Sequence, residues 1–106
     1  MPRTVDHIVA THDLARQHRA AGKPTWQHTL DIADIWQNDD LTLVELRDRI
    51  VTRIKTNRWY TTQDEGSDLH EAVDELGDIT TPDDFDAVWD TIYDLADTDR
   101  CWIRLT

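Results

Sequence analysis

The strongest constraint on the fold of this chain is an apolar stripe near its C-terminus. The members of the stripe recur every three or four residues, at Phe85, Val88, Trp89, Ile92, Leu95 and Ala96. This spacing places them on one face of an α-helix. Thr81 and Pro82 come just before the stripe, where a capping residue and a first-turn proline are expected. The segment therefore predicts a long amphipathic helix with one buried face.

Two helices upstream are predicted by the same combination of a cap and an apolar stripe. Thr42 and Glu45 have the spacing of a capping box, and the helix that they open reaches about Asn57. Ser67 caps a shorter helix, which Gly77 ends. In both segments the apolar residues follow the cap at helical spacing, so each helix also has one face to bury.

A further helix is expected at the N-terminus. Thr4 or Asp6 can cap it, and it runs to about Ala21. Gly22 and Pro24 follow in the order that commonly ends helices. The apolar positions of this helix are modest.

Residues 26–32 alternate between apolar and polar side chains, which is the period-two pattern of a β-strand. Trp26, Leu30 and Ala33 also share a helical face, so a helix over residues 26–36 stays open. Residues 101–105 predict a second short strand that can pair with the first. The predicted fold class is therefore α+β and mostly helical, with about four helices and a minor two-stranded antiparallel ribbon.

The length of 106 residues predicts a single small domain over residues 1–106. Apolar residues make up 39% of the chain, which is enough for one core. Cys101 is the only cysteine, so no disulfide can form within the chain, and we expect Cys101 to be a small buried side chain. We find no signal peptide and no membrane span, and we expect a cytoplasmic protein.

The charge of the chain is strongly asymmetric. Its formal net charge is −11, yet residues 1–63 carry nine basic residues against eight acids. Residues 64–106 carry fourteen acids against Arg100 and Arg104, with no basic residue from Asp64 to Asp99. An acidic surface repels nucleic acid and anionic membranes and attracts basic partners. We therefore expect a basic or nucleic-acid-binding protein as partner, with no direct contact to nucleic acid or membrane.

The acids of the last two predicted helices recur at three- and four-residue steps. We predict that they bind the partner: Glu71, Asp74, Glu75, Asp78, Asp83, Asp86, Asp90, Asp94 and Asp97. At a rise of 1.5 Å per residue, the charges lie about 5–6 Å apart along the axis. Such rows approximate a phosphate backbone, so the protein could be a nucleic-acid mimic that inhibits its partner. The alternatives are a solvated helix face, or internal pairing with Arg47, Arg53 and Arg58.

Two stretches carry a resemblance to a group of proteins. They are KPTWQHTLDIADIWQNDDLTLVELRDRIVTRIKTNRWY (residues 23–60) and DDFDAVWDTIYDLADTDRCWIRLT (residues 83–106). Together they resemble small uncharacterised acidic proteins of actinobacteria and their phages. The resemblance covers most of the chain and contains no diagnostic motif. It implies a phage or mobile-element accessory protein, and it implies no activity and no site residues.

No pattern in the sequence indicates catalysis. His7 and His12 are five residues apart, which suits one helical face poorly, and no metal-ligand spacing occurs. We therefore expect no enzyme activity, no catalytic residue, no bound metal and no cofactor. Two other hypotheses stay open. One is a structural protein that self-associates through exposed Trp36, Trp59 or Tyr60. The other is a small metal-binding enzyme that uses the N-terminal histidines.

Overall fold

The computed structural model describes residues 28–36, 38 and 40–104, apart from the side chain of Arg104. Along the chain these residues form β1 (His28–Asp31), α3 (Ala33–Trp36), α4 (Leu43–Thr56), α5 (Arg58–Thr61), α6 (Asp68–Leu76), α7 (Pro82–Asp99) and β2 (Cys101–Arg104). The helix expected over residues 4–21 lies outside the described residues, as do Trp26, His7 and His12. Within the described residues, no helix has the length and apolar character needed to cross a membrane.

The caps predicted from the sequence begin the three long helices. The Thr42 hydroxyl accepts from the Glu45 amide at 3.2 Å, and the Glu45 carboxylate accepts from the Thr42 amide at 3.4 Å, which completes the capping box of α4. Ser67 accepts from the His70 amide at the start of α6. Thr81 accepts from the Asp84 amide at the start of α7. These bonds satisfy amides that the helices themselves leave without a partner.

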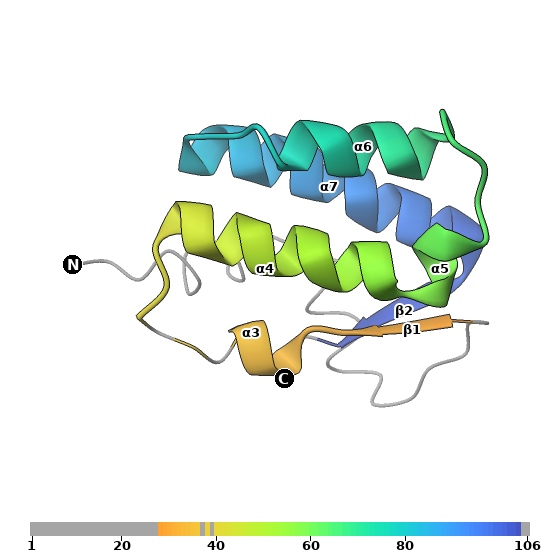
Figure 1. Cartoon of the computed structure of the whole chain (residues 1–106), viewed down its shortest axis with the longest axis horizontal. Helices are drawn as coiled ribbons and strands as arrows, with labels where there is room; N and C mark the ends of the chain where they lie inside the picture. The colour runs from red at the N-terminus through yellow and green to blue at the C-terminus, as the bar shows by residue number, and fades with distance from the viewer. Residues whose placement is uncertain (1–27, 37, 39, 105–106) are drawn as a thin grey trace.

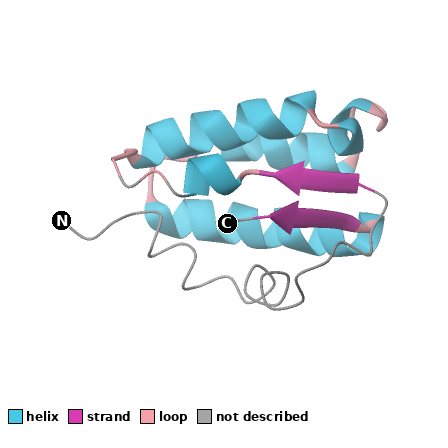
Figure 2. Ribbon diagram, turned by 90° about the horizontal axis from the view of Figure 1, so that it is seen from below, coloured by secondary structure: helices cyan, strands magenta, loops and turns pink. Residues whose placement is uncertain are grey.

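The two short strands follow the predicted positions, but their direction differs from the prediction. β1 and β2 pair in parallel, with His28 opposite Cys101 and Leu30 opposite Ile103 (Figure 2). The prediction of an antiparallel ribbon is therefore wrong. The three long helices between the strands run in alternating directions (Figure 1). An odd number of such passes returns the chain to the end where β1 began, so β2 has to run the same way as β1. Parallel strands need a long crossover of this kind.

The sequence left both a strand and a helix open for residues 26–36, and the described part of this segment contains one of each. His28–Asp31 form the strand, and Ala33–Trp36 form the one-turn helix α3 directly after it. The Asp31 carboxylate accepts from the Ala33 amide at 3.1 Å, which helps to begin this turn. A second short helix, α5, follows α4, and the Asn57 side chain caps it by accepting from the Trp59 amide at 2.8 Å.

The core lies between the three long helices and the sheet. The fully buried members with the largest side chains are Trp59, Trp89, Phe85, Leu30, Ile32, Leu46, Ile50, Ile54, Leu69, Leu76 and Ile92. Cys101 is also buried, as predicted. Trp89 is central to this core. Its ring centroid lies 6.0 Å from the ring centroids of Trp36 and Phe85 and 4.9 Å from that of Tyr93. Such aromatic pairs add stability beyond the area that they bury.

The aromatic residues proposed for self-association are not exposed. Trp36 retains 4% of its accessible surface and Trp59 retains 1%, so both belong to the core. Tyr60 is half-buried, and its ring stacks on His70 with centroids 3.8 Å apart. The hypothesis loses its residues because α3 and α5 turn these side chains inward. Val44 is the only large apolar side chain that is exposed in the described part of the chain.

Candidate functional site

The predicted partner-binding acids lie at the molecular surface. All nine are exposed except Asp86, which is half-buried. On α6 they lie opposite the buried residues Leu69, Val73 and Leu76. We call the surface formed by these nine acids and Asp84 the acidic face.

The α7 acids form one row along the helix. Asp83, Asp90 and Asp97 lie seven residues apart, with Asp86 and Asp94 at the intermediate steps. This spacing holds them on one side of α7, away from the buried Val88 and Ile92. Asp86 and Asp90 each have an interaction within the protein, so they are not unpaired charges.

The α6 acids and the α7 row do not merge into one row. Ala87, Thr91 and Thr98 recur at helical spacing on α7 and are exposed, and they separate the row from the side of the helix that carries Asp84. The predicted surface is therefore two rows of carboxylates with a neutral strip between them. The two rows approach each other at the start of α7, where Asp83 and Asp84 are adjacent.

Asp84 is a member of the acidic face that the stripe pattern did not include. It lines a shallow hollow between the end of α6 and the start of α7, together with Glu75 and Asp78. The apolar side chains of Ile79, Ala87 and Val88 also line this hollow. The sequence does place Asp84 four residues before Val88, one turn away on the α6 side of α7. That signal could be used only once α6 was known to pack beside Val88.

The basic side chains of α4 do not pair with the acidic face. Arg47 contacts Asp48 at 3.0 Å and donates to the Ile79 carbonyl, and Arg53 contacts Asp34 at 2.9 Å. The interpretation that Arg47 and Arg53 neutralise the acids of α6 and α7 is therefore wrong. The two side chains are instead held by Asp48 and the Ile79 carbonyl (Arg47) and by Asp34 and the Asp31 carbonyl (Arg53).

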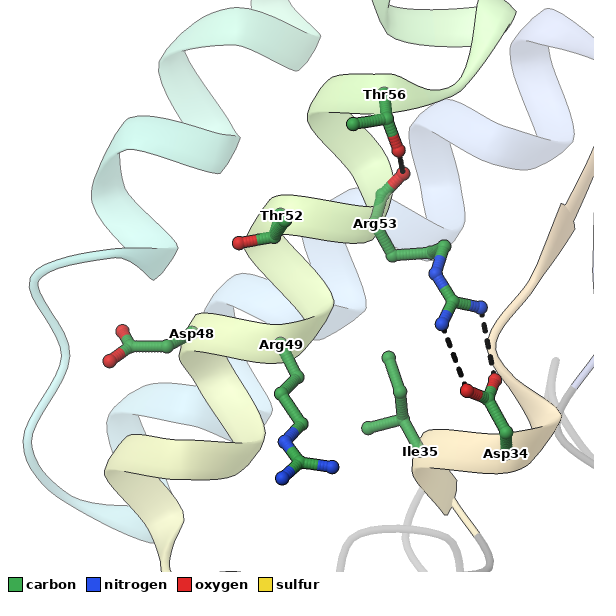
Figure 3. Close-up of a pocket in the computed structure, with 7 residues that line it drawn as sticks. All are labelled: Asp34, Ile35, Asp48, Arg49, Thr52, Arg53 and Thr56. Carbon is green, nitrogen blue, oxygen red and sulfur yellow. Dashed lines mark hydrogen bonds and ion pairs between the residues drawn. The ribbon is translucent and has the colours of Figure 1, made fainter.

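A second feature of the surface is a groove between α3 and α4, with a volume of about 330 Å³ (Figure 3). It is lined by Asp34, Ile35, Asp48, Arg49, Thr52, Arg53 and Thr56. The two terminal nitrogens of Arg53 donate to the two oxygens of Asp34 at 3.0 and 2.9 Å. This hydrogen-bonded guanidinium lowers the pKa of the Asp34 carboxyl. The floor of the groove is Ile35, which is almost fully buried.

The histidines that the structure describes, His28 and His70, are partly buried within the fold. His28 is half-buried in β1. The Nε2 atom of His70 lies 3.0 Å from the Tyr60 carbonyl oxygen, beneath the Tyr60 ring. Among the described residues, no group of three His, Cys, Asp or Glu side chains could hold a metal ion. Burial raises the pKa of the Cys101 thiol to about 12, which keeps it protonated and a poor nucleophile at neutral pH.

Comparison of the chain with protein-family models finds no match, and neither curated proteins nor solved structures match it. The assignment of a function therefore depends on the charges, burial and contacts described above.

Proposed function

We propose that this chain is a small cytoplasmic accessory protein that binds a basic protein partner through the acidic face. The observation that carries the proposal is the exposure of these carboxylates in a segment without lysine or arginine from Asp64 to Asp99. A surface that serves only solubility needs no such segregation of charge, because mixed charges serve it equally well. A concentrated negative surface attracts a basic partner over long range and speeds association.

Mimicry of nucleic acid is the finer form of this proposal. Along α7 the acids provide one charge per about 5 Å of helix axis. A DNA duplex carries one charge per about 1.7 Å. The α7 row alone therefore has about a third of the linear charge density of DNA. A mimic would need the α6 row as well, with its hollow at Glu75, Asp78 and Asp84, so a basic partner has to span both helices.

The test compares three variants that each remove three negative charges. One changes the α7 row (Asp83→Asn, Asp94→Asn, Asp97→Asn), and one changes the α6 row (Glu71→Gln, Asp74→Asn, Glu75→Gln). The matched control changes exposed acids elsewhere (Asp40→Asn, Asp64→Asn, Glu65→Gln). None of these positions includes Asp86 or Asp90, whose interactions within the protein are left intact. Each protein is used to capture binding partners from a lysate, and captured proteins are eluted with salt or with duplex DNA.

We expect the control to retain the partner of the parent protein, and both row variants to lose most of it. Elution by duplex DNA at constant salt would identify mimicry, because DNA and the acidic face would compete for one surface. Elution by salt alone would identify a basic partner without mimicry. Equal retention by all four proteins would show that the acids only solvate the helices, and the proposal would then be abandoned.

A further inference from the structure

The α3–α4 groove contains a positive charge that nothing in the described structure neutralises. Asp34 pairs with Arg53, and Asp48 pairs with Arg47. Arg49 is exposed and lines the same groove, but within the described residues its side chain takes part in no hydrogen bond or ion pair. Its neighbour one turn earlier, Glu45, is hydrogen-bonded to Thr42 in the capping box. The side chains of Lys55 and Arg58 also lack such a partner among the described residues, and Arg49 differs from them by lining the groove.

The position of Arg49 beside Arg53 makes the groove suited to an anion. The two residues are four apart on α4, so their side chains are neighbours on the helix surface. Arg53 extends past Ile35 to Asp34 and Arg49 lies beside Ile35, whereas the Asp48 carboxylate points away from both arginines (Figure 3). The Asp34 carboxylate already lies on one side of the Arg53 guanidinium. A second carboxylate between Arg53 and Arg49 would extend this arrangement into an alternating row of negative and positive groups.

We propose that the α3–α4 groove binds a carboxylate group carried on a short apolar arm. The planar guanidinium of Arg49 can donate two parallel hydrogen bonds to such a group. The short arm would lie against the exposed side chains of Thr52 and Thr56, which line the groove. The site lies on α3 and α4 and uses no residue of the acidic face, so it is independent of the proposed function.

The charge balance of the groove selects a singly charged anion. With Arg47 counted against Asp48 and Arg53 against Asp34, one carboxylate neutralises Arg49 and leaves these side chains without excess charge. A phosphate dianion would leave an excess negative charge close to Asp34, which repels it at short range. Repulsion from the distant acidic face matters less, because salt screens charges beyond about 8 Å at physiological ionic strength.

The proposal is tested by NMR titration of the labelled, full-length protein at physiological ionic strength. The probes are a blocked leucine–glutamate–leucine tripeptide, the same peptide with glutamine, sodium butyrate, and inorganic phosphate. We expect saturable shifts in the amide signals of residues 33–36 and 48–56 with the glutamate peptide or butyrate, with a Kd in the millimolar range, about 1–10 mM. The stronger of these two probes shows whether the carboxylate comes from a peptide or from a small acid. The glutamine peptide should not bind, and phosphate should bind more weakly.

Three variants separate the site from a general charge effect. Arg49→Gln should weaken binding at least about tenfold, whereas Lys55→Gln removes the same charge from an exposed position on the same helix and should leave binding unchanged. Arg49→Lys should bind weakly, because lysine lacks the planar fork. Among the described residues, neither the Arg49 nor the Lys55 side chain takes part in a hydrogen bond or ion pair, and unchanged spectra of the free variants would show that the fold is intact. No saturable shift with any carboxylate, or equal binding by Arg49→Gln, would overturn the proposal.

Discussion

At the scale of single residues, Arg100 has the backbone conformation that suits its side chain least. It ends α7 in the left-handed region with φ of 58°, and it is the only described residue other than glycine with a positive φ. Its amide is hydrogen-bonded to the Asp97 carbonyl at 3.3 Å, and its carbonyl accepts from the His28 amide at 3.5 Å. The chain needs this turn because β2 begins at the next residue and runs in the opposite direction to α7, parallel to β1. Glycine is the usual residue at such a position.

Replacing Arg100 with glycine should therefore stabilise the protein. The left-handed conformation costs a residue with a Cβ about 1–2 kcal/mol, and the greater freedom of glycine in the unfolded chain offsets part of the gain. We expect Arg100→Gly to raise the free energy of unfolding by about 0.5–1 kcal/mol in urea titrations. Arg100→Ala is the control, because it removes the same side chain but keeps the strain. If glycine and alanine gave equal stability, the strain at this position would be negligible.

Cys101 makes stability depend on pH in the alkaline range. Its pKa is raised to about 12 by burial in β2, whereas a thiol in an unfolded chain loses its proton near pH 8.5. Folding therefore favours the protonated thiol: its contribution is complete below about pH 8.5 and declines as pH rises toward 12. At pH 10 we expect Cys101 to lower the free energy of unfolding by about 2 kcal/mol relative to pH 7.

The Cys101 contribution is measured as the difference in this pH dependence between the parent protein and Cys101→Ala. The alanine variant retains every other alkaline titration, so subtraction isolates the thiol. Native protein at pH 8 should also resist alkylation until denaturant is added. Rapid alkylation of the native protein would show that the thiol is accessible.

At the scale of elements, one carboxylate connects α5 to the end of α7. The Asp99 Oδ2 atom accepts from the Trp59 indole nitrogen at 2.9 Å and from the Gln63 side chain at 3.0 Å. Gln63 also donates to the Trp59 carbonyl at 3.0 Å. A carboxylate at a helix C-terminus is unfavourable for the helix dipole. Its position here is explained by the buried indole N–H, which would otherwise have no partner.

Asp99→Ala should therefore destabilise the protein. The substitution leaves the Trp59 N–H buried without an acceptor, which costs about 1–3 kcal/mol. Asp97→Ala is the matched control, since it removes an exposed aspartate from the same last turn of α7. Urea titrations should show a lower midpoint for Asp99→Ala than for Asp97→Ala. Equal midpoints would mean that Trp59 finds another acceptor or that water reaches it.

At the scale of the whole molecule, the net charge of −11 sets a repulsive energy that the fold has to overcome. The ion pairs between described side chains, Arg47 with Asp48 and Arg53 with Asp34, are partly or largely exposed and contribute little. Among the described residues, self-repulsion between the carboxylates is therefore expected to outweigh these pairs. It is expected to be greatest over α6 and α7, whose sequence contains no lysine or arginine.

Added salt should accordingly stabilise this protein. Raising NaCl from about 10 mM to about 150 mM shortens the screening length from about 30 Å to about 8 Å, so we expect Tm to rise. The variant with Asp83, Asp94 and Asp97 changed to asparagine carries less charge and should show a smaller rise. The measurement is thermal unfolding followed by circular dichroism at several salt concentrations. A fall in Tm with salt would mean that attractive pairs outweigh the repulsion.

The features that the sequence determined are those fixed by residues close together along the chain. The caps at Thr42, Ser67 and Thr81 act within one helical turn, so the starts of α4, α6 and α7 could be predicted. The alternation around Leu30 and the exposure of the acids on α6 and α7 follow from local periodicity in the same way. Of the candidate site, the nine acids were identified, but not their division into two rows.

The tertiary structure decided the features that depend on residues far apart. The direction of β2 depends on the three helical passes before it, and the burial of Trp36 and Trp59 depends on what α3 and α5 pack against. Asp84 joins the acidic face only because α6 packs beside it, and the α3–α4 groove exists only where two elements meet. The physical reason is that caps and stripes satisfy hydrogen bonds and periodicity within a few residues. The direction of a strand, the burial of a side chain by another element and the shape of a groove are set by packing between elements. No local sequence pattern specifies that packing.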